Sequence, residues 1–211
     1  KVLMIDMDPQ KDLTDGVKFL KKNNKDVLDL LYDTDLLSNI INPINKSLGI
    51  VRGNENTNHY EKDDDSKDLK EKLLEIKEVY DYVIIDYPPT LVEAGVQGIA
   101  ASNKAIIVTE AEAYPFKNID AMIKDLLVIN KEIEIKILIN KVDMRRSITK
   151  KILSKLKLKY SNQLFEEYIS VSTAFPNANN KKVALRDLKW WPKVLTQLRK
   201  VMEEIENKEE E

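Results

Sequence analysis

The sequence contains no cysteine, which excludes disulfide bonds, thiolate metal sites and cysteine nucleophiles. Glycine is also scarce, with five in 211 residues, and none stands in the G-x-x-x-x-G-K-[ST] pattern that binds nucleotide phosphates. No apolar run approaches the roughly 18 residues that span a bilayer, and the N-terminus has no signal-peptide core. These absences favour a cytoplasmic protein without a membrane span.

The charge balance excludes a strongly basic protein, because the net charge is −2. Any contact with DNA must therefore come from a local basic patch. With 43% hydrophobic residues the chain can bury a large core, and we expect one domain over residues 1–211. Residues 53–68 are rich in acids and predict a polar surface loop rather than a metal cluster. The tail at residues 207–211 is acidic, which disfavours binding to anionic lipid.

Apolar segments alternate with segments of helical spacing along the whole chain. Fully apolar strands separated by helices predict an α/β fold with a mostly parallel central sheet and helices on both faces. The expected strands are 2–5, 48–51, 82–86, 104–112, 135–143 and one near 166–173. The expected helices are parts of 12–31, then 69–79, 91–101, 119–128, 148–158 and 192–206.

Polar side chains follow several of these strands, and in a parallel sheet the strand ends meet at one edge where ligands bind. The residues concerned are Asp6, Asp8, Asp86, Glu110 and Asn140. Carboxylates gathered there favour a divalent cation, because like charges repel unless a cation, a shared proton or water compensates them. A single strand-terminal acid is a weak signal, since every α/β protein has several strand ends.

The order of two segments is more specific: VLMIDMDPQ, followed later by YDYVIIDYPP, resembles the ParA/Soj partition ATPases and their MinD relatives. The resemblance extends through DLTDGV, DVLDLLYD, GIVRGNEN, AASNKAIIVTEAEAYPFKNI and SVSTAFPNANNKKVAL. It implies the fold of the P-loop NTPases, with ATP and Mg²⁺ as cofactors.

The resemblance also implies roles for single residues. Asp8 matches the catalytic acid that positions or activates the attacking water, Asp6 a group near the metal shell, and Asp86 the acid that orients hydrated Mg²⁺. Asn140 matches a side chain that meets adenine, although a turn residue that closes a strand explains it equally well. The loop expected to pack on the base contains Phe175, Pro176 and Asn177.

The chain departs from the family in one respect: the glycine-rich phosphate loop does not occur in it. The 211 residues alone are therefore not expected to hydrolyse ATP. Because the first residue is Lys1 rather than Met, we expect coding sequence upstream that supplies the loop. The alternative is a non-catalytic relative that binds DNA or a partner without a phosphate loop.

Two further patterns concern ligands. NKVD at residues 140–143 matches a guanine-binding motif, but no D-x-x-G segment accompanies it, so guanine is disfavoured. Basic residues predict contacts to DNA phosphates, which we expect at Arg145, Arg146, Lys157, Lys159 and Lys189; a merely solvated basic helix is the alternative. The resemblance implies a homodimer that binds DNA non-specifically on the nucleoid, meets a ParB-like partner and segregates a plasmid or chromosome.

Overall fold

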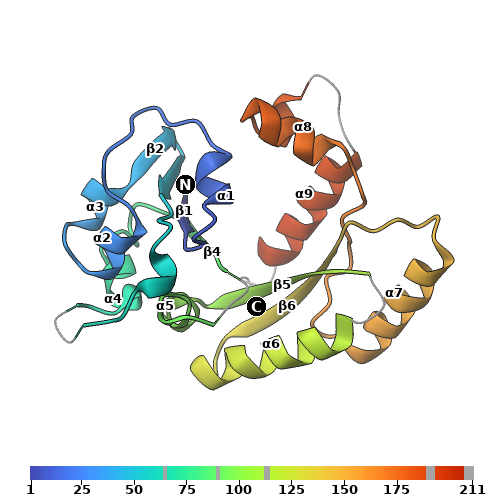
Figure 1. Ribbon diagram of the computed structural model, residues 1–211. Helices are drawn as coiled ribbons and strands as arrows, with labels where there is room; N and C mark the ends of the chain where they lie inside the picture. Colours follow the sequence, from blue (N-terminus) through green and yellow to red (C-terminus); the bar gives the residue numbers. More distant parts are fainter. Residues whose placement is uncertain (64–65, 89–90, 112–114, 189–192, 207–211) are drawn as a thin grey trace. The chain divides into compact units, whose positions relative to one another are not determined.

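The computed structural model describes residues 1–63, 66–88, 91–111, 115–188 and 193–206 (Figure 1). The chain divides into two compact units, Lys1–Ser102 and Asn103–Glu211. Parallel strands and helices make up both units, so the predicted α/β fold class is confirmed. The expectation of one domain over the whole chain stays a prediction. Among the described residues, no helix is both long and apolar enough to cross a bilayer.

The first unit contains a sheet and the helices around it (Figure 1). Its elements are β1 (Val2–Asp6), α1 (Asp12–Asp15), α2 (Val27–Leu31), α3 (Leu37–Ile40), β2 (Asn42–Asn45), β3 (Leu48–Val51), the 3-10 helix η1 (Thr57–His59), α4 (Leu69–Leu74), β4 (Tyr82–Asp86) and α5 (Glu93–Ala101).

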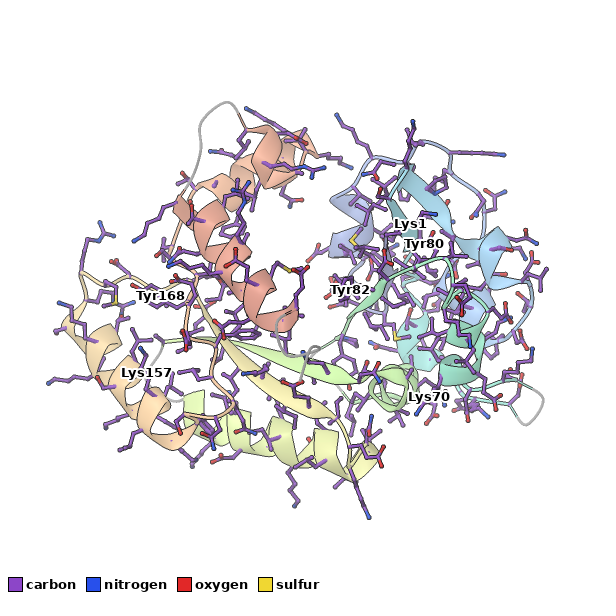
Figure 2. The ribbon with its side chains drawn as sticks, turned by 180° about the vertical axis from the view of Figure 1, so that it is seen from behind. Lys1, Lys70, Tyr80, Tyr82, Lys157 and Tyr168 are labelled. Carbon is purple, nitrogen blue, oxygen red and sulfur yellow. The ribbon has the colours of Figure 1, made fainter. Side chains whose placement is uncertain are left out.

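The four strands of this unit pair in the order β2-β3-β1-β4. β1 runs parallel to both β3 and β4, with Val2 opposite Leu48 on one side and Tyr82 on the other. Figure 2 labels Lys1, Tyr80 and Tyr82 where β1 and β4 begin. An inner strand needs apolar residues on both faces. Leu3 and Ile5 on one face are fully buried, and Val2 and Met4 on the other face are partly buried. β4 is an outer strand of the described sheet, and its Ile84 side chain is 51% exposed.

Three elements of the first unit were not predicted, α3, β2 and η1. β2 pairs antiparallel with β3 and shifts register between Pro43 and Asn45. Proline has no backbone N–H to donate, which confines it to outer strands or bulges. Residues 53–68 are mostly exposed where they are described, but Thr57 and Tyr60 are buried. The Tyr60 ring packs edge-on against Tyr32, with 4.9 Å between the ring centroids.

The second unit has two paired strands. Its elements are β5 (Lys104–Glu110), α6 (Pro115–Ile129), β6 (Glu134–Asn140), α7 (Ser147–Lys159), α8 (Ala174–Lys181), the 3-10 helix η2 (Leu185–Asp187) and α9 (Lys193–Glu206). β5 and β6 are parallel and in register, which places Glu110 opposite Asn140. Figure 1 shows α6 along one face of this pair and α9 on the other.

No regular strand forms at residues 166–173, where one was predicted. The segment instead runs beside β6 and the residues after it through two isolated parallel bridges, Ile137 with Leu164 and Val142 with Ser170, and through backbone hydrogen bonds such as that from the Ile169 amide to the Ile139 carbonyl oxygen at 2.9 Å. Side chains of α9 accept hydrogen bonds from other amides of this segment, which do not bond to β6. Gln197 Oε1 accepts from the Ser170 amide at 3.1 Å, and Glu204 Oε1 accepts from the Glu166 amide at 3.0 Å. The segment is therefore held both by the backbone of β6 and by side chains of α9.

Glycines in α5 allow the helix to lie close to the ends of β1 and β4. A Cβ at Gly95 would lie 2.5 Å from Cε2 of Tyr87, whereas a Cβ at Gly98 would lie 3.1 Å from Sδ of Met7. A methionine side chain can rearrange more easily than an aromatic ring. The Tyr87 ring therefore requires glycine at position 95.

We expect Gly95→Ala to destabilise the chain by about 1–3 kcal/mol through overpacking against Tyr87. Gly98→Ala is the matched control on the same helix and should be nearly neutral, because alanine is the better helix former. Urea unfolding of both variants measures the difference. Equal stability of the two variants would contradict this account of the Tyr87 contact.

Candidate nucleotide and metal site

The acids predicted at the strand ends of the first unit lie on one edge of the sheet. Asp6 and Asp86 are opposite each other at the ends of the parallel strands β1 and β4. The Met7 amide donates to the Asp86 carbonyl oxygen at 3.0 Å, which keeps the chain paired past Asp6. Asp8 follows two residues beyond the strand. The structure therefore places Asp6, Asp8 and Asp86 near one another, and their metal and catalytic roles stay predictions.

The Asp86 carboxylate is disfavoured in its charged form. Its pKa is raised above the ordinary value, first by burial and then by the negative charges of Asp6, Asp8 and Asp12. This combination is typical of a site prepared for a cation or for proton transfer. A cation bound at this edge would relieve the repulsion.

The Asp6 side chain is fully buried and uses both oxygens inside the protein. Its Oδ2 accepts from the Thr14 amide at 2.9 Å and from the Thr14 hydroxyl at 2.5 Å, and its Oδ1 accepts from the Asp8 amide at 3.2 Å. A role of Asp6 near the metal stays a prediction. The sequence interpretation missed Thr14, and no local pattern identifies it, since the two residues are eight positions apart.

Asp8 lies at the beginning of a tight turn. Its Oδ1 accepts from the Gln10 amide at 2.8 Å, and its carbonyl oxygen accepts from the Lys11 amide at 3.0 Å. Lys11 ends the turn in the left-handed region, with φ of 59°. The Asp8 residue is partly exposed. It can therefore close the turn and still present a carboxylate oxygen to a ligand.

The acids fit Mg²⁺ bound through water better than a cage of direct ligands. Within the described ranges, no group of three or more His, Asp or Glu is arranged to enclose a metal ion. Mg²⁺ commonly keeps several waters and takes one or two carboxylates together with substrate phosphates. Asp86, with its raised pKa, and the partly exposed Asp8 are the carboxylates that suit such an ion.

In the second unit, Asn140 ends β6 and closes a local turn. Its Oδ1 accepts from the Lys141 amide at 2.8 Å, and Lys141 is left-handed, with φ of 50°. The Lys141 ammonium pairs with Glu110 at 2.6 Å, so the two strand ends are joined. The turn interpretation of Asn140 is confirmed, and its contact with adenine stays a prediction.

Phe175, Pro176 and Asn177 were expected in a loop, but they lie in helix α8. Proline is tolerated in the first turn of a helix, and Ala174 and Ala178 bury the same face one turn apart. Phe175 packs against the core of the unit, whereas Pro176 and Asn177 are exposed. The position of these residues on a nucleotide base stays a prediction.

The predicted DNA-binding residues differ in their surroundings. Arg145 donates through Nε and Nη2 to both oxygens of Asp143 at 2.8 Å, which lowers the pKa of Asp143 to about 2. Lys159 pairs with Asp120 at 2.5 Å and lies over the rings of Phe116 and Tyr160.

Among the described residues, the other basic side chains of the region 144–159 form no ion pair as close as those of Arg145 and Lys159. Arg146 and Lys157 are exposed, and Lys157 lies on α7 (Figure 2). Lys189 is outside the described residues. Among the described residues, no carboxylate forms an ion pair with the exposed lysines of α7 other than Lys159, namely Lys150, Lys151, Lys155 and Lys157. These four are the cations of α7 that remain available to a ligand.

Parallel strands that end in acids beside helices agree with the fold of the P-loop NTPases. The sequence model of an AAA domain matches residues 1–139. The chain therefore belongs to this AAA domain family, as a ParA/MinD-type ATPase.

Relatives and solved structures agree with this assignment. The sporulation initiation inhibitor protein Soj of Bacillus subtilis is 23% identical over 201 residues, which cover 89% of this chain and 79% of Soj. The structure of apo McdA from Cyanothece has a TM-score of 0.81 at 18% identity, over 96% of this chain and 86% of McdA. A putative plasmid partition protein of Borrelia burgdorferi, bound to AMPPNP, has a TM-score of 0.76 at 18% identity, over 99% of this chain and 86% of that protein.

Neutralising Asp86 should stabilise the fold at neutral pH. Because the folded pKa lies above the ordinary value of 3.8, the folded state binds the proton more tightly, and stability falls as pH rises from 3.8 through the folded pKa. Asp86→Asn removes this loss of stability. It should raise the free energy of unfolding by ~0.5–2 kcal/mol at pH 7, in the range of single stabilising changes. Urea unfolding at a series of pH values should show the gain shrinking toward pH 4; a gain independent of pH would contradict the prediction.

Proposed function

We propose that the protein is an ATP-dependent dimerising switch that segregates a plasmid or chromosome. The observation that carries the proposal is the meeting of Asp8 and Asp86 beyond neighbouring parallel strands, in a chain of the ParA/MinD-type ATPase family. The partition proteins among its relatives and the nucleotide analogue bound to one structural neighbour support the same function.

The residues of the first unit have distinct tasks in this proposal. Asp86 holds the water shell of Mg²⁺, which would shield the charge of the nucleotide phosphates when bound. Asp8 accepts a hydrogen bond from the attacking water and orients it toward the terminal phosphate. Asn140 of the second unit offers its amide to adenine, and Phe175, Pro176 and Asn177 line the path of the base. Groups that cradle the phosphates must come from outside the 211 residues.

A second function is favoured by one observation, which is that no phosphate-loop pattern occurs in the sequence. In that case the chain is a non-catalytic module that binds DNA or a protein partner. Asp8 would then only close its turn, through the Gln10 and Lys11 amides. The two functions differ in whether ATP changes binding to DNA.

The 211-residue chain should show no MgATP turnover, whereas a version extended by its upstream coding sequence should hydrolyse ATP. In the extended protein, Asp8→Ala should lower kcat by ~10²–10⁴-fold, the usual contribution of a positioned acid or base, and leave ATP binding in place. A phosphate-release assay beside nucleotide binding by calorimetry separates the two effects. Turnover by the short chain, or turnover in the extended protein that survives Asp8→Ala, would refute these roles.

We further propose that the ATP-bound homodimer binds DNA non-specifically on the nucleoid, in the cytoplasm, and that a ParB-like partner releases it by stimulating hydrolysis. The region 144–159 supports this proposal, because it contains seven basic residues and no acid. Contacts to phosphates need free cations. Lys150, Lys151, Lys155, Lys157 and Arg146 meet this requirement better than Arg145 and Lys159, which are paired within the protein.

Binding to random-sequence DNA should weaken steeply with salt, with a slope of log K against log salt that falls by about 0.9 for each lost phosphate contact. The double variant Lys155→Gln, Lys157→Gln should lower the steepness of log K against log salt by up to about two, because it removes two cations. Lys159→Gln is the matched control on the same helix and should change it less, because Asp120 already compensates Lys159. Electrophoretic mobility assays at several salt concentrations measure these slopes. Equal effects of both variants, or none, would remove α7 from the DNA surface.

A further inference from the structure

The loop between β1 and α1 is held at both ends by one buried carboxylate. Asp6 Oδ1 accepts from the amide of Asp8, where the loop begins, and Asp6 Oδ2 accepts from the amide and the hydroxyl of Thr14, six residues later. A buried carboxylate is tolerated only when hydrogen bonds replace its water. Release of either end would therefore leave a buried charge poorly compensated.

The neighbouring strand closes this network. Gly53 follows β3, and its amide donates to the Thr14 hydroxyl at 2.8 Å. The Thr14 hydroxyl therefore accepts from Gly53 while it donates to Asp6. A Cβ at Gly53 would lie 2.8 Å from Cγ of Asp6, so position 53 has no room for a side chain. Thr14, which is buried, thus connects the loop with the ends of two parallel strands.

The geometry points to Thr14 as a positioning residue for Asp8, which acts through the Asp6 carboxylate. This inference rests on the proposed function, because Asp8 has a reaction to position only if the protein hydrolyses ATP. Catalytic groups must be held within fractions of an ångström, and a shift of about 1 Å can lower turnover about 100-fold. The turn at Asp8 is stabilised locally by Gln10 and Lys11, and the Asp6 network fixes it to the sheet from both sides, through the Asp8 amide and through Thr14.

The first test uses hydrogen exchange on the 211-residue chain and needs no activity. The amides of Asp8 and Thr14 donate to Asp6 and not to a helix or strand partner, so both should exchange slowly by NMR. Thr14→Val removes the hydroxyl and nearly keeps the shape, and it should speed exchange across residues 7–16 about tenfold or more. Thr14→Ser should restore protection.

Thr57→Val is the matched control for this test. Thr57 is a buried threonine of the same unit, and its hydroxyl donates at 2.5 Å to the Asn54 carbonyl oxygen instead of the Asp6 network. It should leave exchange of residues 7–16 unchanged. Fast exchange of Asp8 and Thr14 in the unchanged chain would overturn the inference, even if Thr14→Val does not fold. Equal acceleration by Thr14→Val and Thr57→Val would overturn it as well.

The second test measures kinetics in the upstream-extended protein. Thr14→Val should lower kcat ~10- to ~100-fold with little change in KM for ATP, and Thr14→Ser should recover most of the loss. A parallel rise of KM without a loss of kcat would refute positioning. If the unchanged extended protein has no turnover, the proposed function fails, and the exchange experiment still decides whether Thr14 holds the loop.

Discussion

The buried Asp6 carboxylate is the interaction on which the rest of the candidate site depends. Asp6 stands at the end of the inner strand β1. Its carboxylate accepts hydrogen bonds from the Asp8 amide and from the amide and hydroxyl of Thr14, and these bonds join the following loop to the strand end. A charge without water is unstable unless its partners stay in place. The hydrogen bonds that compensate this charge therefore set the geometry of the loop, and Asp8 obtains a defined position because its amide donates to the Asp6 carboxylate.

The same edge of the sheet illustrates the opposition between stability and function. Four acids, Asp6, Asp8, Asp12 and Asp86, act on one another closely enough to raise the pKa of Asp86. A chain selected for stability alone would replace one of them with a neutral residue. A bound cation would compensate these acids, which is the part that the proposed function gives to Mg²⁺.

Much of the fold could be predicted from the sequence, because buried parallel strands such as 2–5 and 48–51 are fully apolar. The prediction failed where tertiary contacts decide. Residues 166–173 have the apolar character of a strand, but they meet β6 in an irregular way, while Gln197 and Glu204 of a distant helix accept from the amides of Ser170 and Glu166. In the site, Asp6, Asp8 and Asp86 could be predicted from the sequence, because each stands at or just after the end of an apolar strand. Thr14 and Gly53 could not, since their importance arises from a hydroxyl that connects two segments 39 residues apart.

The apolar outer strand β4 has a consequence for the protein in solution. Its Ile84 side chain is half exposed, and in the second unit Ile106 and Val108 of β5 are exposed as well. Outer strands with apolar residues and little charge readily pair with strands of other molecules. A sheet of this kind is a template for self-association at high concentration, and the behaviour of the purified chain will depend on what covers that strand.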